Sequence, residues 1–143
     1  MGSVNPSGLD RPAALAGRIL FALIFVVSGV DHFVHMDSMA LMAADQGVPL
    51  ARIAVAGTGA LLLTGGLLVL FGWQTRLGAA LLVLVLLPVT VIMHQPLTDS
   101  GAAVQVLKNL ALIGGGLLLL AHGPGALSLD GDTRSTPPED PQP

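Results

Sequence analysis

The 143-residue chain has no cysteine and no tyrosine, and only 10% of its residues are charged. The absence of cysteine excludes disulfides, thiol redox chemistry and thiolate metal sites. Four phenylalanines and one tryptophan are too few for the aromatic belts that commonly anchor membrane proteins. A net charge of −3, without any run of basic residues, argues against a nucleic-acid partner.

The chain is instead rich in hydrophobic residues, which make up 52% of the sequence and give a mean hydropathy of +0.78. Each apolar run is close to the roughly 20 residues that a helix needs to cross a bilayer. The composition and length therefore predict an all-α integral membrane protein, a four-transmembrane-helix bundle in a single domain. The predicted spans are 13–34, 51–72, 77–93 and 103–121.

A short amphipathic segment separates the first two spans. Asp37 or Ser38 is predicted to cap a helix over 39–46, which Gly47 and Pro49 then end. We expect this short helix to be interfacial, lying on the bilayer surface or folded over the end of the bundle.

The two ends of the chain differ in composition from its middle. Residues 1–12 are predicted to form a mobile tail, and residues 123–143, rich in Pro, Asp and Ser, a disordered one. The transmembrane domain is accordingly expected over 13–122. A signal peptide is the competing interpretation of the first span, because Arg11 and Arg18 precede an apolar run; against it, the run lacks a clear A-x-A cleavage site.

The positive charges predict an orientation. With four spans, both termini lie on one side of the membrane, and that side carries four of the six Lys and Arg residues. The positive-inside rule then places both termini in the cytoplasm of a multi-pass protein of the cell's inner membrane. The charges on the side of the termini are Arg11, Arg18, Arg76 and Arg134, and those on the other side are Arg52 and Lys108.

Ionisable residues crowd together where the first span ends. Ionisable groups at membrane depth are costly and tend to mark function. Because the first and third spans end, and the fourth begins, on the same side, short loops should gather their polar residues at one end of the bundle, the outer end by the charge count. The residues expected there are Asp31, His32, His35, His94, Lys108 and Asn109.

A quinone headgroup fits this set of residues best. It needs a hydrogen-bond donor at each carbonyl, an apolar trough for its tail and proton carriers nearby. No tight metal-ligand motif is present, and haem pockets are usually lined with aromatic residues, which are scarce here. We therefore predict neither a metal nor a haem site. His32, His94, Lys108 and Asn109 are the predicted headgroup ligands, and Asp31 and His35 are the predicted proton carriers.

Simpler interpretations of the same residues stay open. Asp31 and His35, four residues apart, suit a solvated helix-end pair, and a histidine near a helix C-terminus interacts favourably with the helix dipole. Lys108 lies early enough in its span to snorkel to the surface.

Several motifs, in this order and spacing, resemble the DoxX family of small bacterial four-helix membrane proteins. The resemblance runs from about Gly17 to Leu120. It implies four transmembrane helices and an oxidoreductase role, since relatives resemble the small membrane subunit of thiosulfate:quinone oxidoreductase. The motifs are Gly17-Arg18-Ile19-Leu20, Ser28-Gly29 with Asp31-His32-Phe33, Gly47-Val48-Pro49, Gly65-Gly66-Leu67-Leu68, Thr75-Arg76-Leu77-Gly78-Ala79, Pro88-Val89-Thr90 with Met93-His94, and Leu107-Lys108-Asn109-Leu110-Ala111.

Two functions follow as hypotheses. In the first, the chain is the membrane subunit of an oxidoreductase system and binds a quinone-like ligand at the outer end of the bundle. Because the chain shows no redox centre of its own, a protein partner must then supply the electrons. In the second, it is a non-catalytic assembly or scaffold subunit of a larger complex, with glycine-rich spans as packing surfaces. Catalysis by the chain itself and a homo-oligomer both remain open. The remaining expected partner is the lipid bilayer.

Overall fold

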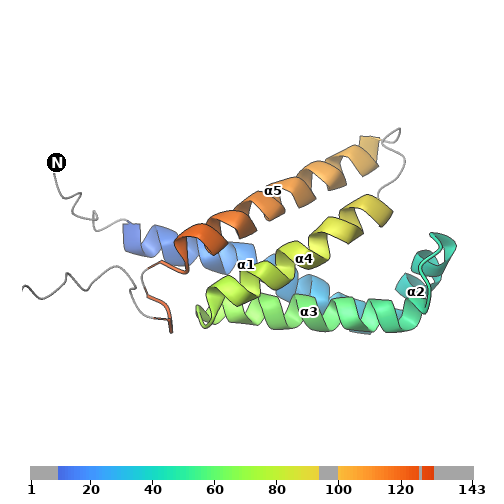
Figure 1. Ribbon diagram of the computed structural model, residues 1–143, viewed down its shortest axis with the longest axis horizontal. Helices are drawn as coiled ribbons and strands as arrows, with labels where there is room; N and C mark the ends of the chain where they lie inside the picture. Colours follow the sequence, from blue (N-terminus) through green and yellow to red (C-terminus); the bar gives the residue numbers. More distant parts are fainter. Residues whose placement is uncertain (1–9, 94–99, 126, 131–143) are drawn as a thin grey trace, which may run out of the picture.

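The computed structural model describes residues 10–93, 100–125 and 127–130, and it contains five helices in this part of the chain (Figure 1). Four of them are long and apolar enough to cross a membrane, which confirms the predicted all-α, four-span architecture. The described residues include no strand. The helices are α1 (Asp10–Val34), α2 (Met36–Asp45), α3 (Ala51–Phe71), α4 (Thr75–Met93) and α5 (Ser100–His122).

The short helix α2 begins at Met36, earlier than predicted, so the predicted caps Asp37 and Ser38 already lie inside it. The prediction of an N-cap was wrong for a physical reason. The amide of His35 donates to the Asp31 carbonyl over 2.9 Å, so helical hydrogen bonding runs almost without a break from α1 into α2. Few amides are therefore left for a side chain to cap. Ser38 instead donates its hydroxyl to the His35 carbonyl.

Glycines bring α3 close to its neighbours on both sides. A Cβ atom at Gly59 would lie 2.8 Å from Cβ of His32 on α1, and one at Gly65 would lie 2.8 Å from Leu82 on α4. Small residues at such points let helix backbones pack tightly within a membrane. The buried core that results draws on α1, α3 and α4, and consists of Ala22, Phe25, Leu62, Val69, Ala79, Leu82, Val85 and Leu86.

The helices pack in the order α1, α3, α4, α5, and α2 folds against α3. At one end of the bundle, which we call the termini end, α1 and α4 begin and α3 and α5 end. There α5 approaches α1, and a Cβ atom at Gly115 would lie 2.9 Å from the ring of Phe21. At the opposite end, which we call the α2 end, α4 and α5 diverge from α1 and α3 (Figure 1). The bundle is therefore closed more tightly at its termini end.

Residues 123–125 and 127–130, which we call the C-terminal strap, continue beyond α5 along the turn between α3 and α4. The amide of Asp130 donates to the Gly72 carbonyl over 2.8 Å, and that of Leu129 reaches the Phe71 carbonyl at 3.4 Å. These contacts lie beyond His122, where the transmembrane domain is predicted to end. Residues 1–9 and 131–143 of the two expected tails lie outside the described residues.

Candidate functional site

His32 lies near the end of α1, half-buried against α3. Its Nδ1 is 2.7 Å from the carbonyl oxygen of Ser28, one turn earlier. A carbonyl oxygen only accepts hydrogen bonds, so Nδ1 carries the proton and donates it. In the neutral ring, Nε2 then holds a lone pair, and no hydrogen bond to Nε2 is found among the described residues. His32 therefore offers an accepting nitrogen at the α2 end of the bundle.

Asp31 and His35 form a pair, as their spacing predicted. Nδ1 of His35 lies 2.7 Å from Oδ1 of Asp31, one helical turn away. The Asp31 side chain is 49% exposed and that of His35 is 59% exposed, so the pair is open to water. Its electrostatic contribution to stability is small at that exposure. The carboxylate orients the imidazole, and that arrangement suits proton exchange between water and the end of α1.

Asn109 is buried between α5 and α4. Its Nδ2 donates to Oγ1 of Thr90 over 3.0 Å, and Thr90 in turn donates to the carbonyl of Leu86 over 2.6 Å. Thr90 thus links Asn109 on α5 to the backbone of α4. Lys108, next to Asn109, is exposed, and no side-chain bond to it occurs among the described residues. Of these two predicted ligands, Asn109 therefore contributes to the packing of α5 against α4, whereas Lys108 does not.

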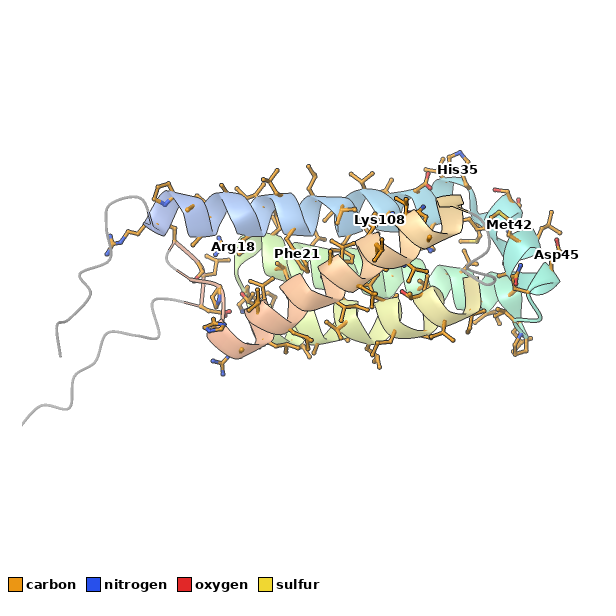
Figure 2. All side chains as sticks on the ribbon, turned by 90° about the horizontal axis from the view of Figure 1, so that it is seen from above. Arg18, Phe21, His35, Met42, Asp45 and Lys108 are labelled. Carbon is orange, nitrogen blue, oxygen red and sulfur yellow. The ribbon has the colours of Figure 1, made fainter. Side chains whose placement is uncertain are left out.

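The predicted residues form two groups that stay apart. The α1 group is Asp31, His32 and His35, and the α5 group is Lys108 and Asn109. In the described part of the chain, no hydrogen bond or ion pair joins the two groups. His94 lies outside the described residues. Figure 2 shows His35 where α1 reaches the α2 end and Lys108 on α5, both remote from Arg18 at the termini end.

An open pocket of about 330 Å³ lies at the α2 end, at the junction of α1, α2 and α3. An ion pair borders it, with Nη1 of Arg52 2.7 Å from Oδ1 of Asp37. Within residues 10–93, 100–125 and 127–130, no three His, Asp or Glu side chains are grouped so as to hold a metal ion. The pocket is lined by Phe33, Val34, His35, Met36, Asp37, Ser38 and Arg52.

Sequence reasoning missed a second polar centre, at the termini end. Arg18 is only 4% exposed, and its guanidinium donates to the carbonyls of Pro124 and Leu127 in the C-terminal strap, over 3.2 and 2.8 Å. Asp130 of the strap accepts hydrogen bonds from Thr75 at the start of α4. The available signal was an arginine inside an apolar run and an aspartate after the last span, two features that nothing in the sequence links.

The electrostatics of Asp130 reflect this setting. Burial on its own would raise the pKa of the Asp130 carboxyl, but hydrogen bonds from Thr75 and Gln74, together with the positive charge of Arg18, lower it below its ordinary value. The carboxylate is thus held in its charged form by the start of α4. This acidic residue is a structural part of the bundle.

The amino-acid sequence of this chain is similar to those of known proteins. The model of the DoxX family matches residues 13–95, from α1 into the residues after α4. The chain is 32% identical over 129 residues to inner membrane protein YphA of Escherichia coli (strain K12), and the aligned residues cover 86% of this chain and 92% of that protein. It is 30% identical over 125 residues to inner membrane protein YqjF of the same organism, covering 85% and 92%. No solved structure matches the chain significantly. The chain, with its four apolar spans, is a multi-pass membrane protein that belongs to the DoxX family.

Proposed function

We propose that the protein is a membrane subunit of an oxidoreductase system and that it binds a quinone-like headgroup at the α2 end of the bundle. The observation that carries this proposal is the arrangement of α1 and α5. Each helix brings polar side chains to that end, and the two helices diverge there instead of packing together (Figure 1). The polar side chains of α1 and α5, the two walls of this proposed site, are joined by no hydrogen bond or ion pair among the described residues, and Nε2 of His32 and the Lys108 side chain remain available to a headgroup.

The chemistry of the two walls suits a quinone and quinol pair. Neutral His32 presents an accepting Nε2, which fits a quinol hydroxyl; the protonated ring presents a donor, which fits a quinone carbonyl. Lys108 supplies a second donor from α5. Leu107 and Leu110, which are 65% and 53% exposed, flank it with apolar surface for an isoprenoid tail. In this proposal Asn109 lies beside the headgroup while it holds α5 to α4.

Reduction of a quinone takes two electrons and two protons. The described residues contain no redox group, so in this proposal a protein partner delivers the electrons. The pair of Asp31 and His35 exchanges protons with water, because both side chains are about half exposed and their 2.7 Å contact fixes the ring. In this proposal His32, three residues before His35 on α1, takes protons from this pair and passes them to the headgroup.

The proposal also includes the orientation of the chain: both termini in the cytoplasm and the α2 end facing outward, across the inner membrane. The two E. coli relatives are inner membrane proteins by name. Because the chain has no cysteine, single cysteines can test the orientation. In intact cells, a membrane-impermeant maleimide should label Asp45→Cys on α2 and leave Gln74→Cys unlabelled until the cells are opened. The reverse pattern would contradict the orientation.

Quinone binding is tested by thermal unfolding of the purified protein with short-chain ubiquinone and menaquinone analogues. We expect a saturating analogue to raise Tm by about 4 °C. The His32→Ala variant keeps the Cβ atom that packs on Gly59 and should lose this protection. His122→Ala is the matched control, because His122 also donates Nδ1–H to a carbonyl one turn earlier, at the opposite end. Equal protection of the two variants, or no protection of the wild type by any analogue, would refute the proposal.

One observation favours the second candidate, a non-catalytic assembly subunit. Asn109 is buried and has its hydrogen-bond partner within the chain, as expected of a residue that fixes helix packing. In that case His32→Ala would leave the activity of the assembled complex unchanged. Thr90→Val, which removes the partner of Asn109, would lower the amount of complex recovered. Quinone protection that depends on His32 would decide against this candidate.

A further inference from the structure

The C-terminal strap places a carboxylate on the first residues of α4. Oδ1 of Asp130 accepts from the amide of Gln74 over 2.7 Å, and Oδ2 accepts from the amide of Thr75 over 2.9 Å and from its hydroxyl over 3.0 Å. Backbone amides that converge at the N-terminus of a helix, reinforced by its dipole, are a common arrangement for binding anions. Gln74 has φ of 46°, a left-handed conformation at the residue that leads into the helix.

Arg18 adds a buried positive charge to this anion-binding arrangement. It is 4% exposed, and it attracts Asp130 electrostatically. Its two terminal nitrogens donate to the strap, whereas its buried Nε has no acceptor among the described residues. A buried donor without a partner is costly, and Asp130 acts on Arg18 through its charge alone, so Nε of Arg18 lacks an acceptor that an added anion could supply.

Gly72 leaves room for this contact. A Cβ atom at Gly72 would lie 2.8 Å from Nη1 of Arg18 and 2.6 Å from Cβ of Ser128, and its φ of 65° favours glycine as well. We call Arg18, Gly72, Gln74 and Thr75 the notch. Without Asp130, the notch would contain one buried cation, two amides and one hydroxyl, with no carboxylate to balance them.

The strap that fills the notch is held mainly by polar contacts. Leu127 and Leu129 are 62% and 72% exposed, so these two leucines bury little apolar surface, whereas Pro124 nearer α5 is buried. Three sets of hydrogen bonds attach the strap. Arg18 donates to two strap carbonyls, the carboxylate of Asp130 accepts from Thr75, and the amide of Asp130 donates to the Gly72 carbonyl. A group that offers the same negative oxygens can therefore compete with Asp130 for the notch.

We propose that the notch is an anion site for a phosphate group, and that Asp130 occupies it in cis when phosphate is absent. The phosphate belongs either to a lipid headgroup or to free inorganic phosphate. Both sources present several negative oxygens, enough to take the three donors that Asp130 uses and to reach Nε of Arg18. This proposal does not depend on quinone binding at the α2 end.

The test is rescue of an Asp130 variant by phosphate. Asp130→Ala empties the notch and should lower Tm in detergent. Adding inorganic phosphate, compared with NaCl at equal ionic strength, should then raise the Tm of Asp130→Ala by about 4 °C and that of the wild type less, because Asp130 competes. A parallel series in lipid nanodiscs compares phosphatidylglycerol with phosphatidylcholine, two lipids that both carry a phosphate but differ in headgroup charge, and a lipid-free micelle series isolates the free ion.

The matched control is Asp37→Ala, which removes a carboxylate from the exposed pair with Arg52 at the other end. It should show no phosphate-specific stabilisation. Adding Thr75→Val to Asp130→Ala should weaken the rescue, because the notch loses its hydroxyl.

Rescue only in micelles with the free ion assigns the site to inorganic phosphate, and rescue only in nanodiscs assigns it to lipid. If Asp130→Ala does not fold, Asp130→Asn, which keeps the shape, takes its place. Equal responses of the Asp130 and Asp37 variants would overturn the proposal.

Discussion

At the termini end of the bundle Arg18 is 4% exposed and donates to two carbonyls of the C-terminal strap, whereas at the α2 end the Asp31 and His35 side chains are 49% and 59% exposed. Both ends carry acidic and basic groups. At the termini end, residues distant in the sequence bind each other and close the bundle. At the α2 end, polar residues mostly bind neighbours on their own helix or on the adjacent one. The first end uses its polar groups to hold distant segments of the chain together, and the second leaves polar groups available to a quinone.

The largest expected effect in this comparison comes from Arg18→Met. The variant removes a buried cation and leaves two strap carbonyls and Asp130 without their donor or counter-charge. We expect the free energy of unfolding in mixed micelles to fall by about 3 kcal/mol. Lys108→Met removes an exposed cation from α5, on the side of the bundle away from Arg18, and should change the free energy of unfolding by less than about 0.5 kcal/mol. Similar losses for the two variants would mean that the ends do not differ as described.

A smaller loss is expected from Thr90→Val, which removes the partner of buried Asn109 while keeping the side-chain shape. Hydrogen bonds between helices in membranes are worth about 0.6 kcal/mol on average, so we expect a loss of about 1 kcal/mol once the orphaned amide is included. Thr64→Val on the exposed side of α3 is the control and should be near neutral. An equal effect at Thr64 would show that Asn109 gains nothing from Thr90.

The next effect depends on pH and concerns the termini end alone. The pKa of Asp130 is lowered in the folded protein, so its contribution to stability is fully present above its unfolded pKa of about 4. That contribution should disappear as the pH falls from about 4 through the folded pKa. Wild-type Tm should therefore fall more steeply in this range than that of Asp130→Asn. Parallel curves would show that Asp130 gains no stabilisation from folding.

The smallest effect is expected for the pair of Asp37 and Arg52 at the α2 end. Both side chains are largely exposed, at 79% and 69%, and such pairs usually contribute less than about 1 kcal/mol. A double-mutant cycle with Asp37→Ala and Arg52→Ala should give a coupling energy below about 0.5 kcal/mol, smaller still at high salt. A coupling above 1 kcal/mol would mean that the α2 end is also held together by charge.

The four spans could be predicted because lipid leaves the chain little choice: long apolar runs must form helices that satisfy their own backbone. The pair of Asp31 and His35 could be predicted for a similar reason, since residues four apart on a helix must be neighbours. The start of α2 could not. Asp37 and Ser38 are good capping residues, but nearly continuous hydrogen bonding from α1 left them nothing to cap.

The contacts that distinguish the two ends join residues far apart in sequence. Arg18 binds the carbonyl of Pro124, 106 residues away, and local periodicity carries no information about such a contact. From the sequence, an arginine early in the first span is equally consistent with a positive charge that sets the orientation of the protein in the membrane. The separation of the α1 and α5 groups likewise depends on how the helices cross, and the order of the spans does not determine that.

The central claim, that the α2 end is the quinone-binding end, is tested most directly by photolabelling with a quinone that carries an azido group on its ring. The labelled peptides are identified by mass spectrometry, with and without an excess of unlabelled quinone. We predict competable labelling of residues 28–38 in and after α1 and of residues 104–113 in α5. Competable labelling confined to the termini end, around Arg18 and the C-terminal strap, would contradict the account, as would labelling that excess quinone does not reduce.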